Sequence, residues 1–152
     1  NFWFKFVYPH KNDIEIGNTQ KVIDIIKQEL SSYTGHIFED IVKEFLILMN
    51  AGNSLPFNFS KIGTWWSGDR EIDVVALSKN EALFVECKWQ NRKTGIDVLK
   101  NLTENAQFVN WQREKDHFAV FSRSGFTLKA EKFAKEKGIL LFTVDEMKAM
   151  FG

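Results

Sequence analysis

The segment from residue 61 to residue 89 constrains the fold more than any other part of the chain. It contains three strand-like runs, KIGTWW (61–66), EIDVVALS (71–78) and EALFVECKW (81–89), separated by short turn sequences. Turns this short join antiparallel neighbours, so the three runs predict a β-meander. The third run is largely apolar on both faces, which indicates a central strand covered on both sides.

Helical periodicity surrounds this meander. Apolar residues recur at helical spacing over residues 19–33 and 35–50, which predicts two helices ahead of it. After the meander, helices and strands are expected to alternate, over residues 95–111, 117–122, 127–138, 139–144 and 145–151. We therefore expect an α/β fold in which an antiparallel three-strand meander is continued by parallel crossover strands, and in which helices flank the mixed sheet.

Length and composition limit the possible functions. A chain of 152 residues can build a substantial core. Its formal net charge is zero, so a nucleic-acid contact would need a local basic patch.

The single cysteine, Cys87, excludes an internal disulfide and fits a reducing, cytoplasmic compartment. No apolar run reaches the ~18 residues that span a bilayer, so no membrane association is expected. No phosphate-binding loop of the GxxxxGK[ST] type is present, so this chain by itself should not hydrolyse ATP.

The chain is expected to have two parts. Residues 1–30 form an N-terminal helical extension that packs on the core, with an aromatic run at 2–8 that is itself expected to be helical. Residues 31–152 form the domain that contains the sheet. Because the chain begins Asn1-Phe2-Trp3 without methionine, we expect a domain of a longer protein; a full-length protein freed of a tag is the alternative.

Three charged residues interrupt the apolar strands. A turn centred between residues 79 and 80 places Asp73 opposite Glu86, and Lys88 diagonal to Asp73. Directly opposed residues have Cβ atoms roughly 4.5–5.5 Å apart, so these side chains should form one cluster. Strict alternation along residues 71–77 would put Asp73 on the same face as Val75.

Two facing carboxylates in a half-buried sheet repel each other and resist losing their hydration, so something must compensate them. One interpretation is an ion-pair ladder in which Lys88 and Arg70 neutralise the acids. The other is a hard divalent cation, for which carboxylate oxygens are natural ligands. Glu39, at the margin of the apolar face of its helix, is either a third acid of this site or a solvated side chain.

Three short motifs, GHIFE (35–39), EID (71–73) and ECK (86–88), together resemble the PD-(D/E)XK nuclease superfamily. The stretches GDREIDVVA and VECKW look like its restriction-endonuclease-like and Holliday-junction-resolvase-like branches. With the opening FWFKFVYPHKNDIEIGN included, the whole chain resembles the C-terminal domain of archaeal ATPases. One departure is Ile72, where the superfamily name has proline.

The resemblance implies a role for each matching residue. Asp73 and Glu86 would be ligands of Mg²⁺ or Mn²⁺, with the backbone carbonyl of Cys87 as a further ligand. Glu39 would be the helix acid that completes or supports the site, and Lys88 the catalytic lysine. The implied function is hydrolysis of DNA phosphodiester bonds by a metal-dependent endonuclease. The alternative is a catalytically weak or silent nuclease-like module that serves DNA docking or protein interaction for an ATPase.

The implied partners are DNA and an attached or associated ATPase module, and a homodimer is compatible with this interpretation. Candidate DNA contacts carry basic or amide groups close to the cluster: Arg70, Gln90, Arg92, Lys93 and Gln107. Gln107 and Trp111 are four residues apart in the helix expected over 95–111, where some nuclease branches place a DNA-contacting pair. A polar residue on a helix face and a core tryptophan explain Gln107 and Trp111 equally well, and an ordinary solvated loop is the alternative for Arg92 and Lys93.

Overall fold

The structure, a computed structural model, describes residue 9 and residues 19–151. The helix expected over residues 2–8 lies outside the described residues. The chain divides into two compact units, residues 1–37 and 38–152. The second unit contains the complete sheet and every residue proposed above for the active site. The extension predicted for residues 1–30 stays a prediction.

The two helices predicted ahead of the meander are one continuous helix, α2 (Thr19–Ala51). The expected break at Gly35 is wrong because a glycine inside a helix costs only about 1 kcal/mol relative to alanine. The helix ends where Ala51, Gly52 and Asn53 predict a cap, since the Gly52 amide donates to the Leu48 carbonyl and Asn53 adopts a positive φ of 53°.

The sheet has five strands in the order β1-β2-β3-β4-β5. They are β1 (Lys61–Ser67), β2 (Arg70–Leu77), β3 (Glu81–Lys88), β4 (Lys115–Ser122) and β5 (Leu140–Thr143). The first three pair antiparallel, whereas β4 and β5 are added in parallel. This arrangement confirms the predicted meander with parallel crossover strands.

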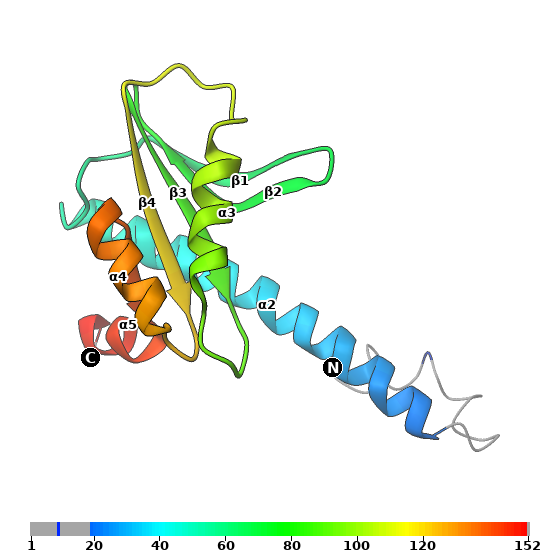
Figure 1. The fold of residues 1–152 in the computed structure, drawn as a ribbon. Coiled ribbons are helices and arrows are strands. Elements are labelled where there is room, and N and C mark those ends of the chain that lie inside the picture. Colours follow the sequence, from blue (N-terminus) through cyan, green and yellow to red (C-terminus); the bar gives the residue numbers. More distant parts are fainter. Residues whose placement is uncertain (1–8, 10–18, 152) are drawn as a thin grey trace. The chain divides into compact units, whose positions relative to one another are not determined.

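Helices cover both faces of the sheet in residues 38–151. One face packs against α2 and α5 (Val144–Phe151), through side chains such as Phe45, Leu46 and Met147. The other face packs against α3 (Ile96–Ala106) and α4 (Leu128–Lys137). Strand β3 contributes buried residues to both clusters, which confirms that it is a doubly covered central strand (Figure 1).

The helix predicted over residues 95–111 ends at Ala106. Arg113 explains the early end, because its guanidinium donates to the carbonyls of Ala106, Val109 and Trp111 at 2.8–2.9 Å. The same group pairs with Asp116 and lies 4.9 Å from the ring centroid of Phe84. A single side chain therefore satisfies the carbonyl groups that a continuing helix would have used.

Replacing Arg113 with lysine is expected to lower the free energy of unfolding by about 1–2 kcal/mol. An ammonium group keeps the positive charge, but it cannot reach three carbonyls and stack on Phe84 at once. Urea denaturation measures the loss, and Arg92→Lys, a change at an exposed position, is the matched control. Equal stability of the two variants would contradict the assigned role of Arg113.

Candidate functional site

The β2–β3 pairing has the register predicted from the turn at residues 79–80. Its paired residues run from Leu77–Ala82 to Val74–Val85. Asp73 and Glu86 lie one position beyond the last pair. The two acids therefore flank the point at which the pairing between β2 and β3 ends, while the β1–β2 hairpin continues past it (Figure 1).

Strand β2 contains a β-bulge at Asp73. Gly63 of β1 pairs with Val75 and Trp65 pairs with Ile72, so Asp73 and Val74 together oppose the single residue Thr64. Ile72 and Val75 consequently pack in the same core cluster. The strict alternation predicted for residues 71–77 is wrong here, because the extra residue shifts which face each side chain takes.

The carboxylate of Asp73 bonds to the backbone of the neighbouring strand. Its Oδ2 accepts a hydrogen bond from the Cys87 amide at 2.8 Å. Burial and the nearby charge of Glu86 raise the pKa of Asp73 to about 7, and the hydrogen bond from Cys87 opposes that rise. Near neutral pH this carboxyl group exchanges readily between its protonated and ionised forms, and an added cation would favour the ionised form.

Glu86 and Lys88 form an ion pair along β3, with 2.8 Å between Lys88 Nζ and Glu86 Oε1. Burial raises the pKa of Glu86, and the charge of Lys88 opposes that rise. Burial lowers the pKa of Lys88, but the charge and hydrogen bond of Glu86 outweigh it, so the net shift is upward. Lys88 is therefore a cation at neutral pH and suits charge stabilisation better than proton abstraction.

Arg70 does not take part in the expected ion-pair ladder. Its Nη1 donates to Asn105 Oδ1 at 2.8 Å, and its guanidinium lies 4.0 Å from the ring centroid of Phe108. It also lies 3.9 Å from Glu104. These contacts direct Arg70 toward α3, and Lys88 is the cation that pairs with Glu86.

Glu39 on α2 joins the same electrostatic cluster. It is half-buried, and its charge raises the pKa values of Asp73, Glu86 and Cys87. The structure thus brings together all four acids and bases that the motifs identified, from α2, β2 and β3. The Cys87 thiol is buried with a pKa well above its usual value, so it remains protonated.

The donor chemistry of this cluster fits a hard divalent cation. Among the residues that the structure describes, no three histidine, cysteine, aspartate or glutamate side chains are grouped as a complete metal cage. Mg²⁺ rarely needs one, since it is usually held by one or two carboxylates and completes its shell with water and substrate phosphates. Asp73 and Glu86 are such a carboxylate pair, and the Cys87 carbonyl is the backbone oxygen between Glu86 and Lys88.

The predicted DNA-contact residues lie in different parts of the structure and do not form one set. Arg92 and Lys93 are exposed in the loop after β3, and the carbonyl of Gln90 accepts a bond from Ser124 Oγ. Gln107 is exposed but lies just past the end of α3. Trp111 lies outside the helix and donates its indole N–H to the Ser78 carbonyl at 3.3 Å. The expected helical pairing of Gln107 with Trp111 is therefore wrong, because Arg113 ends the helix before it.

Sequence reasoning missed Arg123. Parallel pairing of β3 with β4 sets Lys88 beside Ser122, and the next amide, that of Arg123, donates to the Lys88 carbonyl at 2.9 Å. The guanidinium of Arg123 lies 4.8 Å from the ring centroid of Trp89. A parallel register cannot be read from a turn length, so no local signal could have placed Arg123 beside the cluster.

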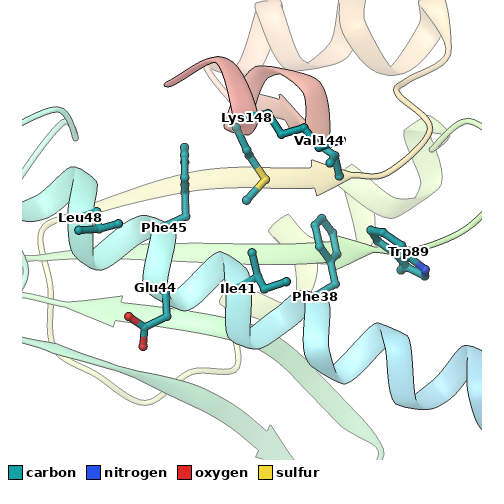
Figure 2. A pocket seen from close by; sticks show the side chains of 9 residues that line it. Phe38, Ile41, Glu44, Phe45, Leu48, Trp89, Val144 and Lys148 are labelled. Atoms are coloured by element: carbon teal, nitrogen blue, oxygen red, sulfur yellow. The ribbon is translucent and has the colours of Figure 1, made fainter. Parts of the chain in front are cut away.

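Trp89 also borders an apolar pocket of about 560 Å³ between α2 and α5. Figure 2 shows Trp89 and Phe38 together at one end of this pocket, with their ring centroids 5.1 Å apart. Ile41, Phe45 and Leu48 line it from α2. Asp73, Glu86 and Lys88 do not line it, so the pocket and the charged cluster are separate features.

Comparison with known proteins identifies the family. A family model described as "Archaea bacterial proteins of unknown function", DUF234, matches residues 3–109. The chain belongs to the DUF234 family. It is 38% identical over 152 residues to "Uncharacterized protein MJECL04" of Methanocaldococcus jannaschii, an alignment that covers 95% of this DUF234 chain. The chain spans about a third (32%) of the length of that relative.

Solved structures resemble the DUF234 chain at low sequence identity. Protein VC1899 from Vibrio cholerae superposes with a TM-score of 0.51 at 19% identity, over 76% of this chain and 31% of that one. A repair endonuclease from Pyrococcus abyssi gives a TM-score of 0.39 at 15% identity, over 56% of this chain and 39% of that one. At such identities the likeness concerns the fold alone.

Within the described part of the chain, no helix combines the length and the apolar character needed to cross a bilayer.

Proposed function

We propose that this DUF234 chain carries a metal-dependent nuclease site that hydrolyses phosphodiester bonds in DNA. The observation that supports this proposal most is the cluster at the end of the β2–β3 pairing. There the bulged Asp73 is held by the Cys87 amide, beside the Glu86–Lys88 ion pair. The order of an acid on a helix, an aspartate on one strand and Glu-x-Lys on the next agrees with the PD-(D/E)XK pattern.

Each residue of the cluster then has a chemical task. Asp73 and Glu86, with the Cys87 carbonyl, would hold Mg²⁺ or Mn²⁺, and Glu39 would add negative charge behind them. When bound, the metal supplies Lewis-acid polarisation of the phosphoryl oxygens and acidifies a water. Lys88, kept protonated by Glu86, would stabilise the negative charge that develops on the phosphate during attack.

The raised pKa values of the two acids are part of this proposal. Asp73 and Glu86 are both costly to ionise in the metal-free protein because they are buried near other negative charges. A divalent cation would compensate both carboxylates at once, so its binding should release protons near neutral pH. Proton release on cation binding is expected of a metal site, whereas acids already neutralised by an ion-pair ladder would not release protons.

The wider context is proposed as well. The chain spans about a third of the length of the M. jannaschii relative, and its sequence resembles the C-terminal domain of archaeal ATPases. We propose that the nuclease site acts on DNA next to an ATPase module that is attached to it or associated with it.

A second function, a catalytically silent docking module, is favoured by two observations. Lys88 pairs with Glu86 at 2.8 Å, and the formal net charge of the chain is zero. In this alternative the ion pair fastens the end of β3, and the domain contacts DNA or protein without cutting.

Cleavage assays separate the two functions. Linear, branched and single-stranded DNA are incubated with the protein in Mg²⁺, in Mn²⁺ and in EDTA, and the products are separated by electrophoresis. Cleavage that requires a divalent cation is the expected result. DNA binding without cleavage of any substrate in either metal would instead support the docking module.

A further inference from the structure

We propose that Arg123 is a phosphate-binding residue that positions the nucleic-acid backbone beside Lys88, with Trp89 as its supporting platform. The inference rests on the proposed function, since it names a contact that the same site would make with its substrate. Arg123 follows β4, and the motifs that identify the acidic cluster do not include it.

Arg123 lies at the same end of the sheet as Lys88. Strands β3 and β4 run parallel, and their last paired residues are Lys88 and Ser122. Arg123 therefore leaves the sheet at the same end as Lys88, and its amide is tied to the Lys88 carbonyl at 2.9 Å. A phosphate held by Arg123 would lie at the same end of the sheet as the phosphate that Lys88 is proposed to stabilise.

Aromatic contacts hold the Arg123 side chain in place. The guanidinium of Arg123 stacks on Trp89 at 4.8 Å, and Trp89 in turn packs on Phe38 at 5.1 Å. Stacking on an aromatic face fixes the plane of a guanidinium while its edge N–H groups stay directed outward. Those N–H groups match the oxygens of a phosphate in a bidentate pair.

The loop that contains Arg123 is held to the loop after β3 by hydrogen bonds and a β-bridge. The buried hydroxyls of Thr94 and Ser122 are 2.8 Å apart, and Ser122 Oγ also donates to the Gly125 carbonyl at 2.9 Å. Thr94 and Phe126 form a parallel bridge between the loops after β3 and β4. These contacts join the loop that follows Trp89 to the loop that contains Arg123.

The positive charge of Arg123 has no acidic partner among residues 19–151. Arg123 is also exposed. By contrast, Arg113 and Arg70 both contact acids. A stacked arginine with no acidic partner beside an anionic substrate site is suited to bind the backbone of that substrate.

The test measures DNA binding in EDTA, where no cleavage occurs, by fluorescence anisotropy with labelled duplex and single-stranded DNA over a range of salt concentrations. Each phosphate contact contributes a slope of about 0.9 to the fall of log K with log salt for duplex DNA and about 0.7 for a single strand. Arg123→Ala should reduce the slope by about that amount and weaken binding several-fold. Arg123→Lys should keep the slope but bind more weakly than the wild type.

Lys115→Ala is the matched control, because Lys115 is an exposed cation at the opposite end of β4. Its salt slope should equal that of the wild type, and thermal unfolding verifies that all variants are folded. An unchanged slope in Arg123→Ala, an equal loss in Lys115→Ala, or no DNA binding by the wild type would each overturn the inference. Loss of slope in Arg123→Ala in a protein that never cleaves DNA would support the inference and count against the proposed catalysis.

Discussion

Replacing Lys88 with alanine is expected to slow metal-dependent DNA cleavage by about 10²- to 10³-fold. This is the usual effect of removing one positioned group that stabilises charge in the transition state. Lys88 forms an ion pair with Glu86, and that pairing keeps its ammonium group protonated. Without it, the proposed metal would be left to stabilise the charge that develops on the phosphate.

Single-turnover assays with saturating protein measure this effect, because they separate the chemical step from DNA binding. Lys115→Ala, which removes an exposed cation from the opposite end of β4, is the control and should cleave at close to the wild-type rate. Thermal unfolding of both variants confirms that they are folded. Cleavage by Lys88→Ala at the wild-type rate would contradict the role of Lys88 and point to a contaminating nuclease or to another site.

Replacing Asp73 with asparagine is expected to have opposite effects on stability and activity. Without metal at pH 8, the variant should be more stable than the wild type by about 2–3 kcal/mol, since a shift of one pKa unit corresponds to about 1.4 kcal/mol and partial solvation reduces the full value. Asparagine keeps an oxygen that can accept the Cys87 N–H, so the local backbone should be preserved. Cleavage should be lost with the metal ligand.

The pH dependence gives this prediction a definite sign. The pKa of Asp73 is raised from 3.8 to about 7 in the folded protein, so the folded state binds more protons than the unfolded state between these values. The stability that the wild type loses to Asp73 ionisation therefore grows as pH rises from about 4 to 7 and is complete above pH 7. Urea denaturation at pH 5 and pH 8 should show the larger gain for Asp73→Asn at pH 8.

Asp69→Asn, in the exposed turn between β1 and β2, is the matched control and should change stability by less than about 0.5 kcal/mol at either pH. An Asp73→Asn variant that is less stable than the wild type at pH 8 would show that Asp73 supports the fold through its charge. The proposal that ionised Asp73 destabilises the metal-free protein and is compensated by a bound cation would then be wrong.

A feature of the fold can be predicted from the sequence when residues close together in the chain determine it, and not when distant residues do. The two-residue turn at residues 79–80 is local, and it determines the register from Leu77–Ala82 to Val74–Val85. The bulge at Asp73 depends on how β1 lies along β2, which no pattern within β2 reveals. The predicted register therefore places Asp73 near Glu86. The hydrogen bond from the Cys87 amide to the Asp73 carboxylate, by contrast, could be found only from the structure.

Tertiary contacts explain the remaining differences. The predicted break at Gly35 was wrong because glycine alone is a weak helix terminator, and α2 continues through it. The end of α3 and the orientation of Arg70 depend on side chains from elsewhere in the chain, Arg113 and Phe108 respectively. Arg123 reaches Trp89 across a parallel strand pair whose offset the sequence does not contain.

The central claim is that the two acids at the end of the β2–β3 pairing form a divalent cation site. Isothermal titration of the metal-free protein with Mn²⁺ tests it most directly, with Glu86→Gln as the site variant and Glu114→Gln, in the exposed loop before β4, as the control. Saturable binding with proton release near neutral pH is predicted for the wild type and for Glu114→Gln, and its loss is predicted for Glu86→Gln. No binding by the wild type, or unchanged binding by Glu86→Gln, would contradict the account.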